Sequence, residues 1–269
     1  MRVTYIDHSG FLVETESAVF LFDYYKGKLP AFPAHKPLFI FASHKHPDHF
    51  SFKIFDLYGH PGGVAYIFGN DIKLSERYLQ RDNIDPAVKE KIHRMSPHTE
   101  LVLPLQGDKG NRGEAVLIHA LKSTDAGAAF YVREGNIRIY HGGDLNWWHW
   151  KGESESFHKG QETLYKAEIN YLKELLEKEE ENEKKAENKK EIENKKKEGT
   201  VNKLDAAFIP LDPRLEEAYS YGMDYFLSQI PVKAVFPMHM WGDYEVIDRY
   251  LESEAGKEYA KHIFFTKPS

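Results

Sequence analysis

Short runs of β-branched and aromatic residues alternate with turn residues along most of the chain, a pattern typical of β-rich domains. Residues 2–7, 11–15 and 18–22 predict three consecutive antiparallel strands, separated by tight turns at Ser9-Gly10 and Glu16-Ser17. Further strands are predicted at residues 38–42, 64–68, 114–121, 128–133, 137–140, 206–210 and 234–237. Helices are predicted at residues 51–58, 86–94, 215–229 and 244–254.

Each half of the chain therefore begins with antiparallel strands and continues into strand–helix units. Two mixed β-sheets packed face to face, with helices on the outside, would satisfy this order. We expect one domain over residues 1–269, of α/β class.

The segment 177–198 departs from this pattern, since nine Glu and eight Lys occupy 17 of its 22 positions. Such a segment cannot bury a core, whereas the residues before it carry an apolar stripe at helical period. We expect one helix over residues 160–198 whose first half docks on the domain and whose second half projects into solvent or frays. This charged insertion is either a simple solvated arm or a contact to a partner or to a second copy of the chain.

The composition narrows the chemistry, because the 269 residues include fourteen His and no Cys. Disulfides, thiolate metal sites and a Cys nucleophile are excluded, so any metal must be held by His, Asp or Glu. A net charge of −6 argues against general binding to nucleic acid or to anionic membranes. With no long apolar run and no signal-peptide pattern at the start, we expect a cytoplasmic protein.

Candidate ligands are densest at His44, His46, Asp48 and His49, directly after the predicted strand 38–42. Residues two apart in an extended segment point the same way, so His44 and His46 can ligate one ion together. Asp48 and His49 can then aim at a second position close by. A polar loop with incidental histidines is the alternative, but such density after a buried strand is costly without a ligand to neutralise it.

Two later predicted strands also end in ligand-type residues. Residues 137–140 lead through two glycines to Asp144, and residues 234–237 lead to His239. The glycines allow close backbone approach, and the Asp144 carboxylate could bridge two cations and lower their mutual repulsion.

With His-x-His-x-Asp-His at 44–49, Gly-Gly-Asp at 142–144 and His239, the sequence resembles the metallo-β-lactamase fold superfamily of hydrolases. His8-Ser9-Gly10-Phe11 resembles the start of its metal-dependent hydrolases related to ascorbate-lactone hydrolases. The resemblance implies a four-layer αβ/βα sandwich with metals at one edge. It also implies a first ion on His44 and His46, a second on Asp48, His49 and His239, and Asp144 between the two ions.

The family's third histidine on the first ion has no counterpart, since residues 121–127 contain none. Asp125 is the predicted substitute, and Thr124 a weaker one; alternatively Asp125 only closes a turn before Gly127. A carboxylate in place of a histidine would make the ligand set of the first ion harder. We expect one or two divalent ions, zinc first, with manganese or iron as alternatives.

The surroundings suggest a pocket. Trp148 and Trp241 lie beside two ligand segments, and Tyr24 lies in a loop that could cover the site, although core packing and a plain surface loop are the alternatives. His8 and His141 are candidates for hydrogen bonding to the ligands, or else ordinary structural histidines.

These features predict a hydrolase in which a metal-activated hydroxide attacks a small-molecule ester, lactone or amide, with Asp48 as the proton shuttle. A nucleotide phosphodiesterase and a non-catalytic metal-binding protein of the same fold are the alternatives. No nucleic-acid or membrane partner is expected, and the charged helix could join copies of the chain.

Overall fold

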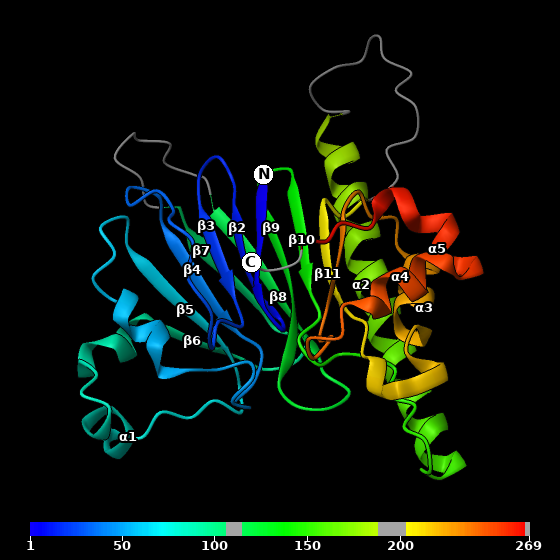
Figure 1. Ribbon diagram of the computed structural model, residues 1–269. Helices are drawn as coiled ribbons and strands as arrows, with labels where there is room; N and C mark the ends of the chain where they lie inside the picture. The colour runs from blue at the N-terminus through cyan, green and yellow to red at the C-terminus, as the bar shows by residue number, and fades with distance from the viewer. Residues whose placement is uncertain (106–114, 188–202, 267–269) are drawn as a thin grey trace.

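A computed structural model describes residues 1–105, 115–187 and 203–266, which form two six-stranded sheets and surrounding helices (Figure 1). The strands of the first sheet follow chain order: β1 (Arg2–Asp7), β2 (Gly10–Glu14), β3 (Val19–Phe22), β4 (Leu38–Ala42), β5 (Val64–Gly69) and β6 (Ile92–Met95). The second sheet also keeps chain order: β7 (Glu100–Pro104), β8 (Ala115–Lys122), β9 (Ala128–Glu134), β10 (Ile137–His141), β11 (Ala206–Pro210) and β12 (Val235–Met238).

Both sheets change from antiparallel to parallel pairing along their width. The first is antiparallel from β1 to β3 and parallel from β3 to β6. The second is antiparallel from β7 to β10 and parallel from β10 to β12. This confirms the order predicted for each half of the chain.

Helices cover the outer faces of the sheets. The α-helices are α1 (Glu76–Arg81), α2 (Glu155–Glu187), α3 (Tyr221–Gln229), α4 (Glu245–Glu252) and α5 (Glu254–Tyr259). Short 3₁₀ helices are η1 (Phe52–Leu57), η2 (Pro86–Lys91), η3 (Pro213–Ala218) and η4 (Ala260–His262). Figure 1 shows α1 on the side of the first sheet and α2 to α5 on the side of the second, so the four-layer sandwich is confirmed. None of the described helices has the length and apolarity needed to cross a membrane.

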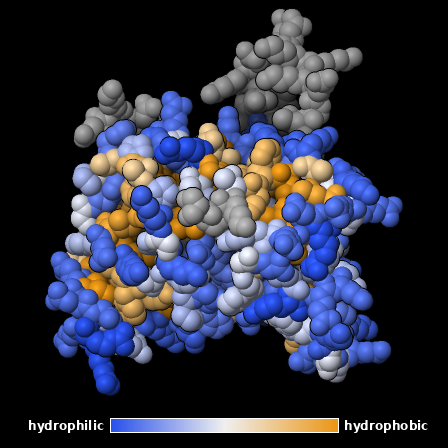
Figure 2. Space-filling model, viewed as in Figure 1, coloured by the Kyte–Doolittle hydropathy of each residue, from blue (hydrophilic) through white to orange (hydrophobic). Residues whose placement is uncertain are grey.

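Alternating side chains build the layers. Phe20 and Phe22 of β3 point into the core between the sheets, whereas Val19 and Leu21 pack toward the helices outside the first sheet. This follows from the period of two along a strand. Burial of each such side chain stabilises the fold by about 1.5–3 kcal/mol. Seen in the same view, the surface is mostly hydrophilic, with hydrophobic residues gathered in patches over the strands and beside the C-terminal helices (Figure 2).

Some predicted elements differ from the observed ones. The predicted strands 38–42 and 206–210 have the observed bounds, but the helix expected over 86–94 is wrong in its last three residues. Ile92–Met95 forms β6, because it pairs in parallel with β5, and this pairing overrides the local pattern. The helix expected over 215–229 is broken into η3 and α3, and Glu216 within η3 has a φ of 53°.

The long helix starts earlier than expected, at Glu155, and the predicted part from 188 to 198 lies outside the described residues. The beginning of its charged tract is docked rather than projecting. Glu179 accepts hydrogen bonds from the Tyr131 hydroxyl at 2.6 Å and from Arg138 Nε at 3.3 Å, and Glu183 accepts one from Arg138 at 2.8 Å. The expected contact between copies through this segment stays a prediction.

Candidate metal centre

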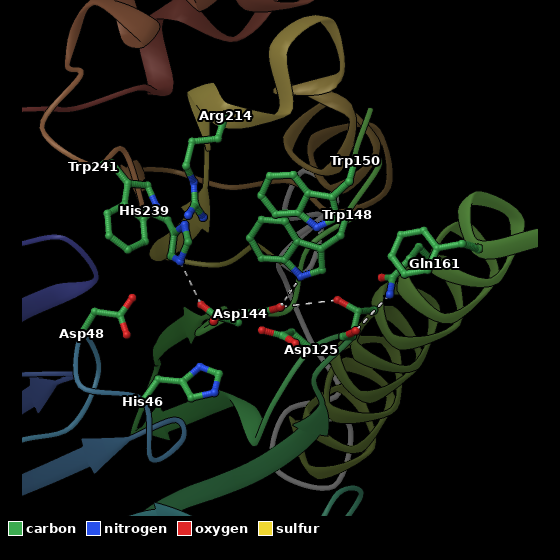
Figure 3. A pocket seen from close by; sticks show the side chains of 12 residues that line it. His46, Asp48, Asp125, Asp144, Trp148, Trp150, Gln161, Arg214, His239 and Trp241 are labelled. Atoms are coloured by element: carbon green, nitrogen blue, oxygen red, sulfur yellow. Dashed lines mark hydrogen bonds and ion pairs between the residues drawn. The ribbon is translucent and has the colours of Figure 1, made fainter. Parts of the chain in front are cut away.

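The predicted ligands meet at one edge of the sandwich, where several strands end. His8 follows β1, His44 follows β4, Asp144 follows β10 and His239 follows β12. Both sheets therefore contribute side chains to one site (Figure 3). Residues far apart in the sequence are brought together because parallel strands end at the same edge of a sheet.

Two groups of ligand atoms form there, each within 4.8 Å of one another: His44, His46 and Asp144 in the first, and His8, Asp48, His49 and His239 in the second. Asp144 faces both groups. Its Oδ2 lies 3.3 Å from His44 Nε2, and its Oδ1 lies 3.1 Å from His49 Nε2 and 3.3 Å from His239 Nε2. This is the geometry of a carboxylate between two cation positions.

Three of these atoms, His8 Nε2, His49 Nε2 and Asp144 Oδ1, are buried and make no well-aligned hydrogen bond to a described residue, although His49 Nε2 and Asp144 Oδ1 lie 3.1 Å apart. A buried polar atom without a partner costs about 1–3 kcal/mol, and three that converge on one place call for a common ligand. Imidazole nitrogens and carboxylate oxygens suit zinc, manganese or iron. The residues present therefore fit divalent metal ions.

Two buried carboxylates orient the histidines of the second group. His49 Nδ1 donates to Asp23 Oδ2 at 2.8 Å, and His239 Nδ1 donates to Asp212 Oδ2 at 2.9 Å. Each bond places the proton on Nδ1 and leaves Nε2 free toward the site. Neither Asp23 nor Asp212 is among the site residues predicted above from the sequence. Both follow buried strands closely, the same signal that identified the ligands.

The electrostatics show that the site is rich in negative charge. Burial would raise the pKa of Asp144, but the nearby imidazoles of His49, His239 and His44 hold it well below its usual range. Burial lowers the pKa of His49, yet the Asp144 and Asp23 carboxylates outweigh it and raise this pKa to about 10. Without metal, protonated imidazole supplies the positive charge that a cation would otherwise supply.

His8 has a different character. Burial, with His239 and His49 close by, lowers the pKa of His8 to about 2, so its imidazole is neutral. It was predicted to assist the ligands through hydrogen bonds, but the structure places its Nε2 within the second group itself.

Glycines allow the segments of the site to approach each other. Gly127 has a φ of 67°, and a side-chain carbon there would overlap the Ser43 carbonyl and lie 2.5 Å from His44 Cβ. Gly143 has a φ of 49°, and a carbon there would lie 2.6 Å from Ser43 Cβ. Both positions combine a backbone conformation that favours glycine with close contact to the end of β4.

Backbone strain also gathers at the site. His8, Asp23, His239 and Trp241 all have positive φ, at 52°, 41°, 64° and 56°. Each such non-glycine residue costs of order 1–3 kcal/mol and persists only where its surroundings impose it.

A cavity of about 360 Å³ opens beside the ligands. Its lining includes His46, Asp48, Asp125 and the two tryptophans named above, Trp148 and Trp241. Asp125 faces this cavity but belongs to neither group of convergent ligand atoms among the described residues.

Three predicted residues make contacts that differ from the expected ones. Tyr24 does not line the cavity, because its hydroxyl donates to the Gly27 carbonyl and its ring packs outside the first sheet. Thr124 lines the cavity, but its hydroxyl donates to the Asn146 carbonyl at 2.6 Å, which makes it a structural link. His141 contacts the Ser9 carbonyl through Nε2 at 2.9 Å and accepts the Gly143 N–H, so it supports the Gly-Gly-Asp turn.

Comparison with known proteins agrees with this geometry. A family model described as a β-lactamase superfamily domain matches residues 2–155, more than half of the chain. The fold is similar to Igni18, a metallo hydrolase from the archaeon Ignicoccus hospitalis, with 12% identity, a TM-score of 0.53 and coverage of 99% of this chain and 94% of that one. It is also similar to a possible metal-dependent hydrolase from Veillonella parvula, with 8% identity, a TM-score of 0.51 and coverage of 98% and 96%. Among curated proteins, none matches.

Proposed function

This chain belongs to the β-lactamase superfamily, and from that premise we propose that it is a metal-dependent hydrolase that cleaves a small-molecule ester, lactone or amide. Kinship with ascorbate-lactone hydrolases is part of the proposal, since His8-Ser9-Gly10-Phe11 supports it. The observation that carries the proposal is the convergence of two ligand groups on either side of Asp144, at the wall of an open cavity.

We assign the ions to the two groups. The first ion would be held by His44, His46 and Asp144, with Asp125 as a further ligand offered from the cavity wall. The second ion would be held by His8, Asp48, His49 and His239, and the Asp144 carboxylate faces both groups. Zinc is the first choice, with manganese and iron as alternatives. When bound, the ions supply Lewis acidity and lower the pKa of coordinated water toward neutrality.

Asp48 is the proposed proton carrier. Its side chain is 24% exposed, whereas those of His8 and His49 are 3% and 0% exposed. Its Oδ2 lies 3.5 Å from His8 Nε2 and borders the cavity, so it can accept a proton there and return it to a leaving group.

The tryptophans hold the cavity in shape. Trp148 Nε1 donates to the Asp144 carbonyl at 3.0 Å, which ties the aromatic wall to the bridging residue. Its ring stacks on that of Trp150 with an interplanar angle of 2°. An apolar wall beside polar ligands limits the water that can reach the reacting atoms.

The test begins with elemental analysis of natively purified protein, followed by the variants Asp144→Ala and His46→Ala. Both are expected to lose metal and hydrolysis together in a panel of lactones, esters, thioesters and bis(4-nitrophenyl) phosphate. His35→Ala is the matched control, because His35 is exposed and belongs to neither ligand group. Full metal content and turnover in both site variants would refute the assignment, and cleavage of the phosphodiester alone would replace the substrate class.

A further inference from the structure

Arg214 is the one Lys or Arg side chain among the described residues that line the cavity. It lies in η3, two residues after the buried Asp212. Arg214 Nε donates to Asp212 Oδ1 at 2.9 Å, and Arg214 Nη2 donates to Asp212 Oδ2 at 2.5 Å. Its Nη1 makes no hydrogen bond to a described residue, and the Arg214 side chain is 44% exposed.

Two indole rings hold the guanidinium in place. Its central carbon lies 4.2 Å from the ring centroid of Trp241 and 5.3 Å from that of Trp150. Figure 3 shows Arg214 between Trp241 and the Trp148–Trp150 pair, above Asp144 and His239. The Asp212 carboxylate therefore fixes one edge of the guanidinium, and the aromatic rings fix its plane. Little entropy remains to be lost when a ligand binds the other edge.

We propose that this free edge of Arg214 anchors the negatively charged group of the substrate, which is a small organic anion with a flat, apolar body. Arg214 would thus determine specificity in the reaction proposed above, on which the inference rests. Neutralising Asp212 requires only one cation and would not require a clamped guanidinium facing the cavity. A planar guanidinium can donate from one edge to the Asp212 carboxylate and from another edge to a ligand.

The charge and shape of the cavity fit such a ligand. Two divalent ions together with Arg214 would balance the five carboxylates of the site (Asp23, Asp48, Asp125, Asp144 and Asp212), so the loaded site would not repel an anion. The stacked rings of Trp148 and Trp150 offer a flat wall, and about 360 Å³ suits a small molecule rather than a polymer. A carboxylate and a phosphate monoester share the chemistry that Arg214 recognises.

The test measures binding rather than turnover. Tryptophan fluorescence reports directly on the cavity, because Trp148, Trp150 and Trp241 line it. Benzoate and phenyl phosphate are titrated into the natively purified protein, with benzamide as the neutral probe. We expect at least one anion to bind roughly tenfold or more tightly than benzamide, the ratio of one charge-assisted hydrogen bond. The preferred anion identifies the charged group.

The variants Arg214→Lys and Arg214→Met are expected to lose this preference. Arg214→Lys keeps a cation for Asp212, so it remains informative if Arg214→Met does not fold. Lys151→Met is the matched control, because Lys151 lies beside Trp150 in sequence and pairs with Glu216 outside the cavity. Metal content is measured for each variant, since Asp212 also orients His239.

Two results would overturn the proposal. One is equal binding of the anions and benzamide by the unaltered protein. The other is a preference that survives in Arg214→Lys and disappears after chelation, which would assign the anion to the metals. Neither result depends on hydrolysis, so a failed substrate screen and a failed anchor are told apart.

Discussion

Gly127 offers a sharp test of how the fold shapes the metal centre, through the substitution Gly127→Ala. The added carbon would lie 2.0 Å from the Ser43 carbonyl oxygen and 2.5 Å from His44 Cβ, against 3.4 Å for ordinary contact, so the two segments must separate by about 1.4 Å. The left-handed backbone adds about 1–2 kcal/mol for a residue with a side chain. His44 is a proposed ligand, and Ala128 N–H donates to the Ser43 carbonyl at 3.0 Å, so the shift would reach the site.

Gly135→Ala is the matched control. Gly135 also has a positive φ, of 56°, but nothing lies within 4 Å of an added carbon. The Gly135→Ala variant should therefore lose only about 1–2 kcal/mol of unfolding free energy, the cost of the left-handed backbone. The Gly127→Ala variant should lose roughly 1–3 kcal/mol more of unfolding free energy, the usual cost of overpacking a tight site.

Two assays separate the effects. Chemical denaturation gives the free energy of unfolding, and calorimetric titration of the chelated protein with zinc or manganese gives metal affinity. Gly127→Ala should weaken metal binding by about tenfold or more, because ligand displacements of this size disturb coordination. If Gly127→Ala matched Gly135→Ala in both measurements, close packing against the end of β4 would not position the ligands.

Three further predictions concern other parts of the molecule. Asp212→Asn and Asp23→Asn should each weaken metal affinity by roughly 10–100-fold, and unchanged titrations would show that these carboxylates do not orient the ligands. The folded pKa of His8 is about 2 against 6.5 in the unfolded chain, so the unfolded state binds more protons as the pH falls and the metal-free fold is destabilised. Between pH 7 and 5 the unfolding free energy of the metal-free protein should fall by about 2 kcal/mol more than that of the His8→Asn variant. If the unfolding free energies of the two proteins changed in parallel with pH, the prediction would be wrong. Glu179→Gln should lower the free energy of unfolding by about 1–3 kcal/mol, whereas the exposed Glu177→Gln should change it little, and equal effects would argue against docking of the charged helix.

The sequence predicted those parts of the site whose ligands lie close together in the chain. A single buried strand is followed by His44, His46, Asp48 and His49, so their spacing alone predicts that they bind metal at one site. The two-sheet order was predictable for a similar reason, since alternation and turns are local signals. β6 was mistaken for helix, because only its pairing with β5 makes it a strand.

The remaining site residues depend on contacts across the fold. The role of Asp23 comes from His49, 26 positions away, and that of Arg214 comes from Trp150 and Trp241 in two other segments. A single Asp or Arg after a strand has many uses, and no spacing in the chain distinguishes them. His8 could be associated with the site, but its place within the second ligand group requires the geometry.

The origin of the ligands in both sheets gives the metal ions a mechanical role. His44 and His49 belong to the first sheet's edge, whereas Asp144 and His239 belong to the second, so bound ions tie the two layers together as a cross-link would. Among the described residues, apolar side chains also join the inner faces of the two layers. Bound ions would add direct bonds between the layers, so we expect metal binding to restrict movement of the two halves of the chain relative to each other.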